Sequence, residues 1–177
     1  MGKRSLSEHN QRSMTEALDK LNKGVSALCV GLFILLFFLI SLQVISRYAL
    51  SDPFTWTEEC SRALFIWICF LGASVAQRNK NHITIDFFMR FFSEKARILL
   101  AVFVHVLTLL FFGLLIIKGA ELMQRGYFLP FVTVSWLNWG HIYAAVPVTG
   151  SIMFCYSLDE IVSLLSRPGT FFLKRKR

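Results

Sequence analysis

The chain has 177 residues, a formal net charge of +8 and a strongly apolar composition, with 55% hydrophobic residues and 18 Phe. This apolar share is far above that of soluble domains and excludes a soluble globular protein. Four apolar runs predict an all-α integral membrane protein with four transmembrane helices and short amphipathic interfacial helices, because about 20 apolar residues cross a bilayer. We expect a single membrane domain over residues 1–177, with spans at about 25–46, 55–77, 97–118 and 138–160.

The N-terminal tail, residues 1–24, carries an amphipathic pattern before the first span. Apolar residues recur at helical spacing from Met14 to Val25. We therefore predict a helix that lies on the membrane surface until the chain turns into the bilayer at Gly24. The first span follows too long a charged tail to be a cleaved signal peptide, so we expect it to remain in the mature protein.

The stretch PFTWTEECSR places two carboxylates just before the second apolar run. Thr55-x-x-Glu58 has the spacing of a capping box, and both Glu58 and Glu59 suit the positive end of a helix dipole. Arg62 follows on the same helix face, and Trp56 is typical of an interfacial aromatic belt. We predict that the glutamates cap and anchor the second span. A catalytic carboxylate pair is the alternative, but no nucleophile, His or metal-ligand spacing accompanies it.

Arg47 ends the first span shortly before these glutamates. Because the hairpin between the first two spans brings the chain back, we predict that Arg47 pairs with Glu58 or Glu59 in a partly buried contact. Removing one partner of such a contact leaves an uncompensated charge, which costs roughly 3–5 kcal/mol.

The distribution of Lys and Arg predicts the orientation. Of the 19 Lys and Arg residues, 15 lie in the N-terminal tail, in the loop 78–97 and in the basic tail 161–177, while only four lie in the other two connections. The positive-inside rule then places both termini in the cytoplasm (N-in/C-in). The positive charge is therefore a topology signal that also attracts membrane lipids, and no nucleic-acid partner is expected.

The connections between the spans also carry apolar residues. The middle loop, HITIDFFMRFFSEKAR, is amphipathic and is predicted to lie in the membrane interface, with His82 beside Asp86 in a structural role. The third connection is predicted to form the outer aromatic belt through Tyr127, Trp136, Trp139 and Tyr143.

The predicted spans contain few side chains that could carry out chemistry or bind a cofactor. Transporters and pumps place ionisable groups near the bilayer midplane, whereas we expect only His105 inside a span. His105 and His141 lie at different depths, about 12 Å and about 25 Å from the cytoplasmic edge, which argues against a shared haem iron. His105 is expected to be packed or to face a partner. The four cysteines lack a C-x-x-C spacing and are expected to be free thiols. We therefore predict no catalytic, cofactor-binding or metal site and no enzymatic activity.

Two pairs of small residues offer faces for close helix packing. Gly72-x-x-x-Ala76 lies in the second predicted span, and Gly140-x-x-x-Ala144 lies at the start of the fourth. Because a four-helix bundle of this size buries only one stripe of each helix, much of the Phe-rich surface must face lipid or another protein. We expect the apolar helices to serve a larger partner.

Residues 46–88, SRYALSDPFTWTEECSRALFIWICFLGASVAQRNKNHITIDFF, resemble the signature of the small, DctQ-type membrane subunit of tripartite ATP-independent periplasmic (TRAP) transporters. The later YAAVPV, which contains Pro147, is also similar. The positions that match the family pattern are Arg47, Pro53, Trp56, Glu58, Glu59, Leu71, Gly72, Ala73, Arg78, His82, Ile83 and Asp86.

The resemblance implies a role in organic-acid uptake across a bacterial inner membrane. In such systems a periplasmic substrate-binding protein delivers the acid, of the C4-dicarboxylate or sialic acid class, to a large TRAP membrane subunit that moves it with sodium ions. The small subunit packs against the scaffold of the large one and has no transport site of its own. The alternative is a haem-carrying or structural membrane anchor of a redox complex.

The resemblance also gives the small-residue faces a partner. We expect one contiguous face, including the Gly72 and Ala76 side or the Gly140 and Ala144 side, to dock the large subunit. Either Gly72→Trp or Gly140→Trp is then expected to abolish uptake without preventing membrane insertion, because a protein interface demands a shape that lipid does not.

Overall fold

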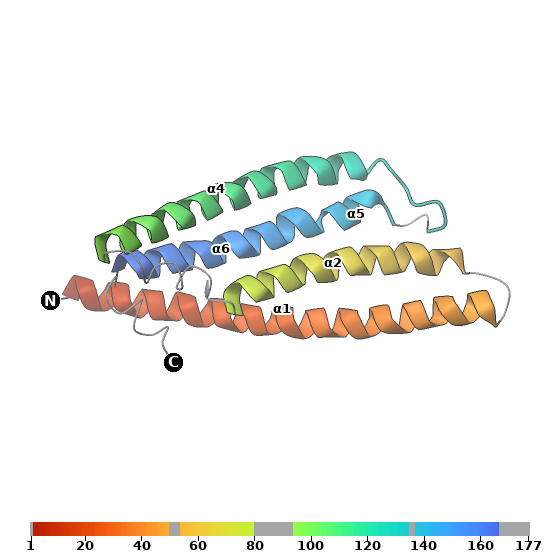
Figure 1. Ribbon diagram of the computed structural model, residues 1–177, viewed down its shortest axis with the longest axis horizontal. Helices are drawn as coiled ribbons and strands as arrows, with labels where there is room; N and C mark the ends of the chain where they lie inside the picture. Colours follow the sequence, from red (N-terminus) through yellow and green to blue (C-terminus); the bar gives the residue numbers. More distant parts are fainter. Residues whose placement is uncertain (1, 50–53, 80–93, 135–136, 167–177) are drawn as a thin grey trace.

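The computed structural model in Figure 1 describes residues 2–49, 54–79, 94–134 and 137–166. These residues form the helices α1 (Gly2–Tyr48), α2 (Thr55–Asn79), α4 (Glu94–Gly126), α5 (Trp139–Tyr143) and α6 (Ala145–Ser166). Four helical segments are long and apolar enough to cross a membrane, the last of which combines α5 and α6. The predicted all-α fold with four spans is confirmed.

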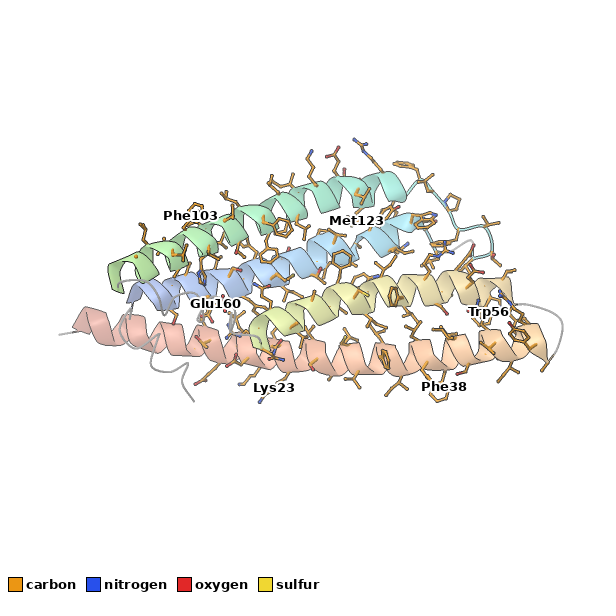
Figure 2. All side chains as sticks on the ribbon, in the orientation of Figure 1. Lys23, Phe38, Trp56, Phe103, Met123 and Glu160 are labelled. Carbon is orange, nitrogen blue, oxygen red and sulfur yellow. The ribbon has the colours of Figure 1, made fainter. Side chains whose placement is uncertain are left out.

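The four long helices lie in a row rather than in a closed bundle. α1 packs on α2, α2 packs on α6, and α6 packs on α4, so that α1 and α4 form the two edges of the row (Figure 1). The expected bundle is therefore opened out. Helices in lipid can adopt this arrangement because apolar side chains lose nothing by facing acyl chains. Phe38 on α1 and Phe103 on α4 are each 64% exposed and point outward from the two edges (Figure 2).

α1 is one continuous helix, so the predicted turn into the bilayer at Gly24 is wrong. A glycine inside a helix lowers the stability of the helix by only about 1 kcal/mol. At Gly24, no atom lies within 4 Å of the place where a Cβ would be. The turns on the N-terminal side of Gly24 are held on the other helices by Asp19, which pairs with Arg78, and by Asn22, which bonds to Asn79. These contacts keep the tail on the axis of the span.

α4 continues beyond the predicted limit at residue 118 and ends at Gly126. Its last turns carry a ladder of charges in which Glu121 accepts hydrogen bonds from Lys118 at 3.0 Å and from Arg125 at 2.6 Å. Ion pairs at i,i+3 and i,i+4 favour the helix. α4 is therefore extended outside the apolar run by its own surface charges.

The fourth predicted span, residues 138–160, is two helices that meet at Ala144. Pro147 explains the break, because it has no N–H to donate to the carbonyl of Tyr143 four residues earlier. The hydrogen bond from the Val148 amide to the Ala144 carbonyl, at 3.2 Å, marks the start of the second helix. α6 then continues to Ser166, beyond the predicted end.

Some predicted features lie outside the described residues. They are Pro53, His82, Asp86, Trp136, the amphipathic middle loop and the basic tail from residue 167. The four cysteines do lie within the described part, and all are free thiols as expected.

Candidate functional site

Charged and polar side chains from all four long helices meet near the end of the row where α1 begins. Arg78, in the last turn of α2, donates from Nη1 to Asp159 Oδ2 on α6 at 2.7 Å. It also donates from Nη2 and Nε to Asp19 Oδ1 on α1, at 2.8 and 3.0 Å. The side chains of Arg78 and Asp159 are only 11% and 9% exposed. One guanidinium therefore ties three helices together through a nearly buried ion pair.

The buried ion pair is supported by two further contacts. Thr15 on α1 donates its hydroxyl to the other carboxylate oxygen of Asp159 at 3.1 Å, and the guanidinium of Arg78 lies 5.4 Å from the centre of the Tyr156 ring. A buried ion pair is tolerated only where further hydrogen bonds offset the lost hydration, and an aromatic face adds cation–π attraction. Both oxygens of Asp159 are thus satisfied.

Neutral side chains add further contacts around Arg78 and Asp159, and we call the whole group the polar layer. The amide of Gln77 donates to Ser157 Oγ at 2.9 Å and to the Met153 carbonyl at 3.3 Å, which joins α2 to α6. Asn22 donates to Asn79 Oδ1 at 2.9 Å and joins α1 to α2. These bonds fix the register of α2 against both of its neighbours.

His105 brings α4 into the same layer. It is 4% exposed, its Nε2 lies 3.4 Å from Glu160 Oε2 on α6, and its Nδ1 lies 2.7 Å from the Ala101 carbonyl. Glu160 is labelled in Figure 2, where it projects from α6. The interpretation of His105 as a packed histidine is confirmed. The expectation that it is the only ionisable group in a span is wrong, because the fourth span also contains Asp159 and Glu160.

The opposite end of the row is organised by Glu59. Its carboxylate accepts hydrogen bonds from the backbone N–H of Thr133, at 3.2 and 3.3 Å, and of Val134, at 3.1 Å. Both donors lie in the loop between α4 and α5. Glu59 therefore anchors this loop to α2, a long-range role that the predicted cap did not include.

Glu58 behaves differently from its neighbour. It pairs with Arg62 at 3.1 Å on an exposed helix face, which confirms the predicted same-face contact. α2 begins at Thr55, and the side-chain hydrogen bond of its first turn comes from Thr57, which donates to the Phe54 carbonyl at 2.6 Å. Trp56 is 41% exposed, as suits an interfacial residue.

Arg47 does not make the predicted contact. It is exposed, and among the described residues it forms no ion pair with Glu58 or Glu59. Both carboxylates have other partners, namely Arg62 and the backbone of the α4–α5 loop. The pairing was inferred from chain proximity alone, whereas these competing partners become visible only in three dimensions.

Gly140 lies inside the chain rather than on a free face. A Cβ built on it would lie 2.7 Å from the Tyr127 ring, 2.8 Å from the Tyr127 nitrogen and 2.9 Å from the Met123 carbonyl oxygen. A Cβ built on Gly126, on the other side of the crossing, would lie 2.7 Å from the Gly140 nitrogen. The two glycines allow α4 and α5 to touch backbone to backbone, so the predicted docking face on the Gly140 side is taken up internally.

The remaining small residues are less constrained. A Cβ on Gly72 would meet only Cys29 Sγ on α1, at 3.9 Å, while Ala76 and Ala144 are half-buried. Pro147 packs on α4, since its Cδ lies 3.0 Å from the Cβ position of Gly119. Gly72 therefore belongs to the contact between α1 and α2.

We expect Glu59→Ala to release the α4–α5 loop. The substitution removes the acceptor for two backbone N–H groups, and hydrogen bonds to a charged group contribute about 1.5–3 kcal/mol. Amide hydrogen exchange of Thr133 and Val134 should therefore accelerate at least about tenfold. Glu58→Ala is the matched control, because an exposed i,i+4 pair contributes less than about 1 kcal/mol. Equal exchange rates in the two variants would contradict the anchoring role.

The polar layer was only partly visible in the sequence. Arg78 appeared in the family resemblance, but Asp159 was missed as its partner. The available signal was that Asp159 and Glu160 have no Lys or Arg within four residues on either side, so that each needs a partner from another helix. Among the described residues, no three His, Cys, Asp or Glu side chains gather to hold a metal ion.

The chain is similar to known transporter proteins. A family model described as "Tripartite ATP-independent periplasmic transporters, DctQ component" matches residues 36–167. The sialic acid TRAP transporter small permease protein SiaQ of Vibrio cholerae is 30% identical over 149 residues, which cover 82% of this chain and 83% of that protein.

Of two further relatives, one is much longer and the other is named for a different substrate. The sialic acid TRAP transporter permease protein SiaT of Haemophilus influenzae is 31% identical over 86% of this chain, but the match covers only 26% of SiaT. The C4-dicarboxylate TRAP transporter small permease protein DctQ of Pseudomonas aeruginosa is 24% identical over 68% of this chain and 60% of its own length.

Proposed function

The chain belongs to the DctQ-component family of the TRAP transporters, and on this premise we propose that it acts as a static brace in organic-acid uptake. It is a small membrane subunit of such a transporter, for sialic acid or a C4-dicarboxylate, as the names of its relatives indicate. The proposed brace packs against a large membrane subunit that carries the substrate with sodium ions. A periplasmic binding protein delivers the substrate.

A large membrane partner is supported by the length of one relative. In SiaT, the segment that resembles this chain makes up only 26% of the protein, so most of that permease is additional sequence. The open row of helices suits such a partner. Among the described residues, no further helix covers either face of the row. Large apolar side chains such as Phe33, Phe37 and Leu114 are at least 60% exposed.

The absence of a transport site is supported by where the charges lie. By sequence, residues 24–46, 63–77, 98–117 and 140–158 contain no Asp, Glu, Lys or Arg. Asp159 and Glu160 lie toward the C-terminal end of the fourth span, and Asp159 pairs with Arg78 to hold the helices together. Since moving an organic acid requires polar groups at membrane depth, this arrangement is the observation that carries the proposed role as a brace.

The orientation with both termini in the cytoplasm is part of this proposal and rests on the distribution of Lys and Arg. The polar layer around Arg78 would then lie at the cytoplasmic side and Glu59 at the periplasmic side. An alkaline phosphatase fused to the C-terminus should be inactive, and an active fusion would refute this orientation.

The expected outcome of purification is that the tagged chain retains the large membrane subunit after detergent extraction. Reconstituted alone in liposomes with an inward sodium gradient, it should take up neither labelled sialic acid nor labelled succinate. Together with the large subunit and the binding protein, it should support uptake of one of them. Uptake by the chain alone would refute the brace.

The haem-anchor alternative has a separate readout, because a haem protein would show a Soret band after purification. The positions of the histidines count against it. His105 contacts Glu160 near one end of the row, and His141 lies in α5 near the other (Figure 1). Nineteen residues of sequence separate His141 from Glu160, or about 28 Å of helix, which is too far for one iron.

A further inference from the structure

A cavity of about 560 Å³ opens beside α1 at the level where α2 ends. Its polar wall includes Asp19, Asn22 and Lys23, with Arg78 from α2, and its apolar wall includes Ala27 and Val30. The α1 residues follow one another at helical spacing, so they form one stripe. The stripe passes from charged to apolar in the direction of the span.

The cavity lies at the boundary of the membrane-spanning segments. Lys23 is the last charge before the apolar run of α1, and Arg78 is the first charge after that of α2. Figure 2 places Lys23 on α1 near the end of α2. Long basic side chains extend to the headgroup region at such positions. The polar wall therefore lies at headgroup level, and Ala27 and Val30 lie about 6 and 10 Å deeper along the helix.

Three groups on the polar wall have hydrogen-bonding capacity that the described residues do not use. Asn22 is 8% exposed; its amide donates to Asn79, but its Oδ1 has no partner within the described structure. Both bonds from Arg78 end on Oδ1 of Asp19, whose side chain remains 57% exposed. Lys23 is exposed and has no ion-pair partner in the described part of the chain. A buried acceptor without a donor is costly.

We propose that this cavity binds the headgroup of a phospholipid with a primary ammonium group, of the phosphatidylethanolamine class. The phosphate lies against Lys23, the ammonium donates to Asn22 Oδ1 and Asp19 Oδ2, and an acyl chain follows Ala27 and Val30. Along α1 the ammonium-binding residues come first, Lys23 follows, and the apolar residues come last. The lipid has the same order of ammonium, phosphate and acyl chain. One exposed cation and one exposed anion also match a zwitterion.

The same chemistry discriminates against other headgroups. A phosphatidylcholine has the same charges, but its quaternary ammonium has no N–H to donate. A phosphatidylglycerol has hydroxyl donors but no positive charge to place beside the exposed Asp19 Oδ2. The site is therefore specific for a lipid that combines an anionic phosphate with N–H donors, and its occupation does not depend on the transported acid.

Native mass spectrometry of the full-length chain in detergent tests this assignment with defined lipids. One dioleoyl phosphatidylethanolamine should be retained about tenfold more tightly than the matching phosphatidylcholine or phosphatidylglycerol, as expected for one charge-assisted hydrogen bond. Lys23→Ala should remove about tenfold of that affinity, whereas Lys118→Ala, an exposed lysine at the other end of the row, should not. Glycerophosphoethanolamine, which lacks acyl chains, should not compete at equal concentration.

Three results would overturn the proposal. Equal retention of the three lipids with no effect of Lys23→Ala would identify an unspecific lipid shell. Preferential retention of phosphatidylglycerol would identify an anionic-lipid site. Effective competition by glycerophosphoethanolamine would identify a soluble phosphate ligand instead of a membrane lipid.

Discussion

Replacing Arg78 with methionine should destabilise the purified chain by about 3–5 kcal/mol, because it leaves the buried Asp159 carboxylate without its counter-charge. Methionine retains most of the apolar stem, so the effect reports the lost charge rather than lost packing. The midpoint of thermal unfolding, followed by Trp fluorescence in detergent, should fall by roughly 10 °C. The contacts among α1, α2 and α6 should weaken together, since Arg78 bonds to Asp19 and Asp159 at once.

We call the contacts of Arg78 with Asp19 and Asp159 the clamp. A double-mutant cycle distinguishes the loss of this clamp from a general loss of stability. Arg78→Met combined with Asp159→Asn removes both buried charges and should recover part of the loss, because no uncompensated carboxylate remains. Arg62→Met is the matched control, since its pair with Glu58 is about half exposed and contributes less than about 1 kcal/mol. Losses of equal size in Arg78→Met and Arg62→Met would show that the buried pair is not a clamp.

The clamp shows why the sequence predicts the spans better than their tail. Four spans follow from apolar runs, which is a local property of about 20 residues. The continuity of α1 through Gly24 depends instead on Asp19 and Thr15, whose partners Arg78 and Asp159 lie 59 and 144 residues away along the chain. A local pattern contains no information about such pairs, so the tail was predicted to lie on the membrane surface.

The site residues near α2 illustrate the same limit at short range. The pairing of Glu58 with Arg62 follows from helical spacing and was predictable. Glu59 stands next to Glu58 and has the same chemistry, yet it holds a loop 74 residues away. Helical geometry places adjacent residues about 100° apart around the axis, so they face different surroundings. What the second face meets is decided by the packing of α2 against its neighbours.

Gly140→Ala should destabilise the isolated chain by about 1–3 kcal/mol or more, because its Cβ would approach two backbone atoms, the Met123 oxygen in α4 at 2.9 Å and the Tyr127 nitrogen just after α4 at 2.8 Å. Backbone atoms cannot move aside as a flexible side chain can, so α5 must separate from α4. Gly72→Ala is the control, since its Cβ meets only Cys29 Sγ at 3.9 Å, an ordinary contact. Its effect on stability should be below about 1 kcal/mol.

Measuring the isolated chain separates internal packing from docking. If Gly140 serves the crossing of α4 and α5, Gly140→Ala and Gly140→Trp lower the thermal midpoint in the absence of any partner, and uptake is lost because the brace itself is disordered. A docking face predicts the opposite pattern, with unchanged stability of the isolated chain and loss of the large subunit in co-purification. Unchanged stability with loss of co-purification in the Gly140 variants would contradict the structure. The same result for Gly72→Trp would place the docking face along α1 and α2, where Gly72 lies against Cys29.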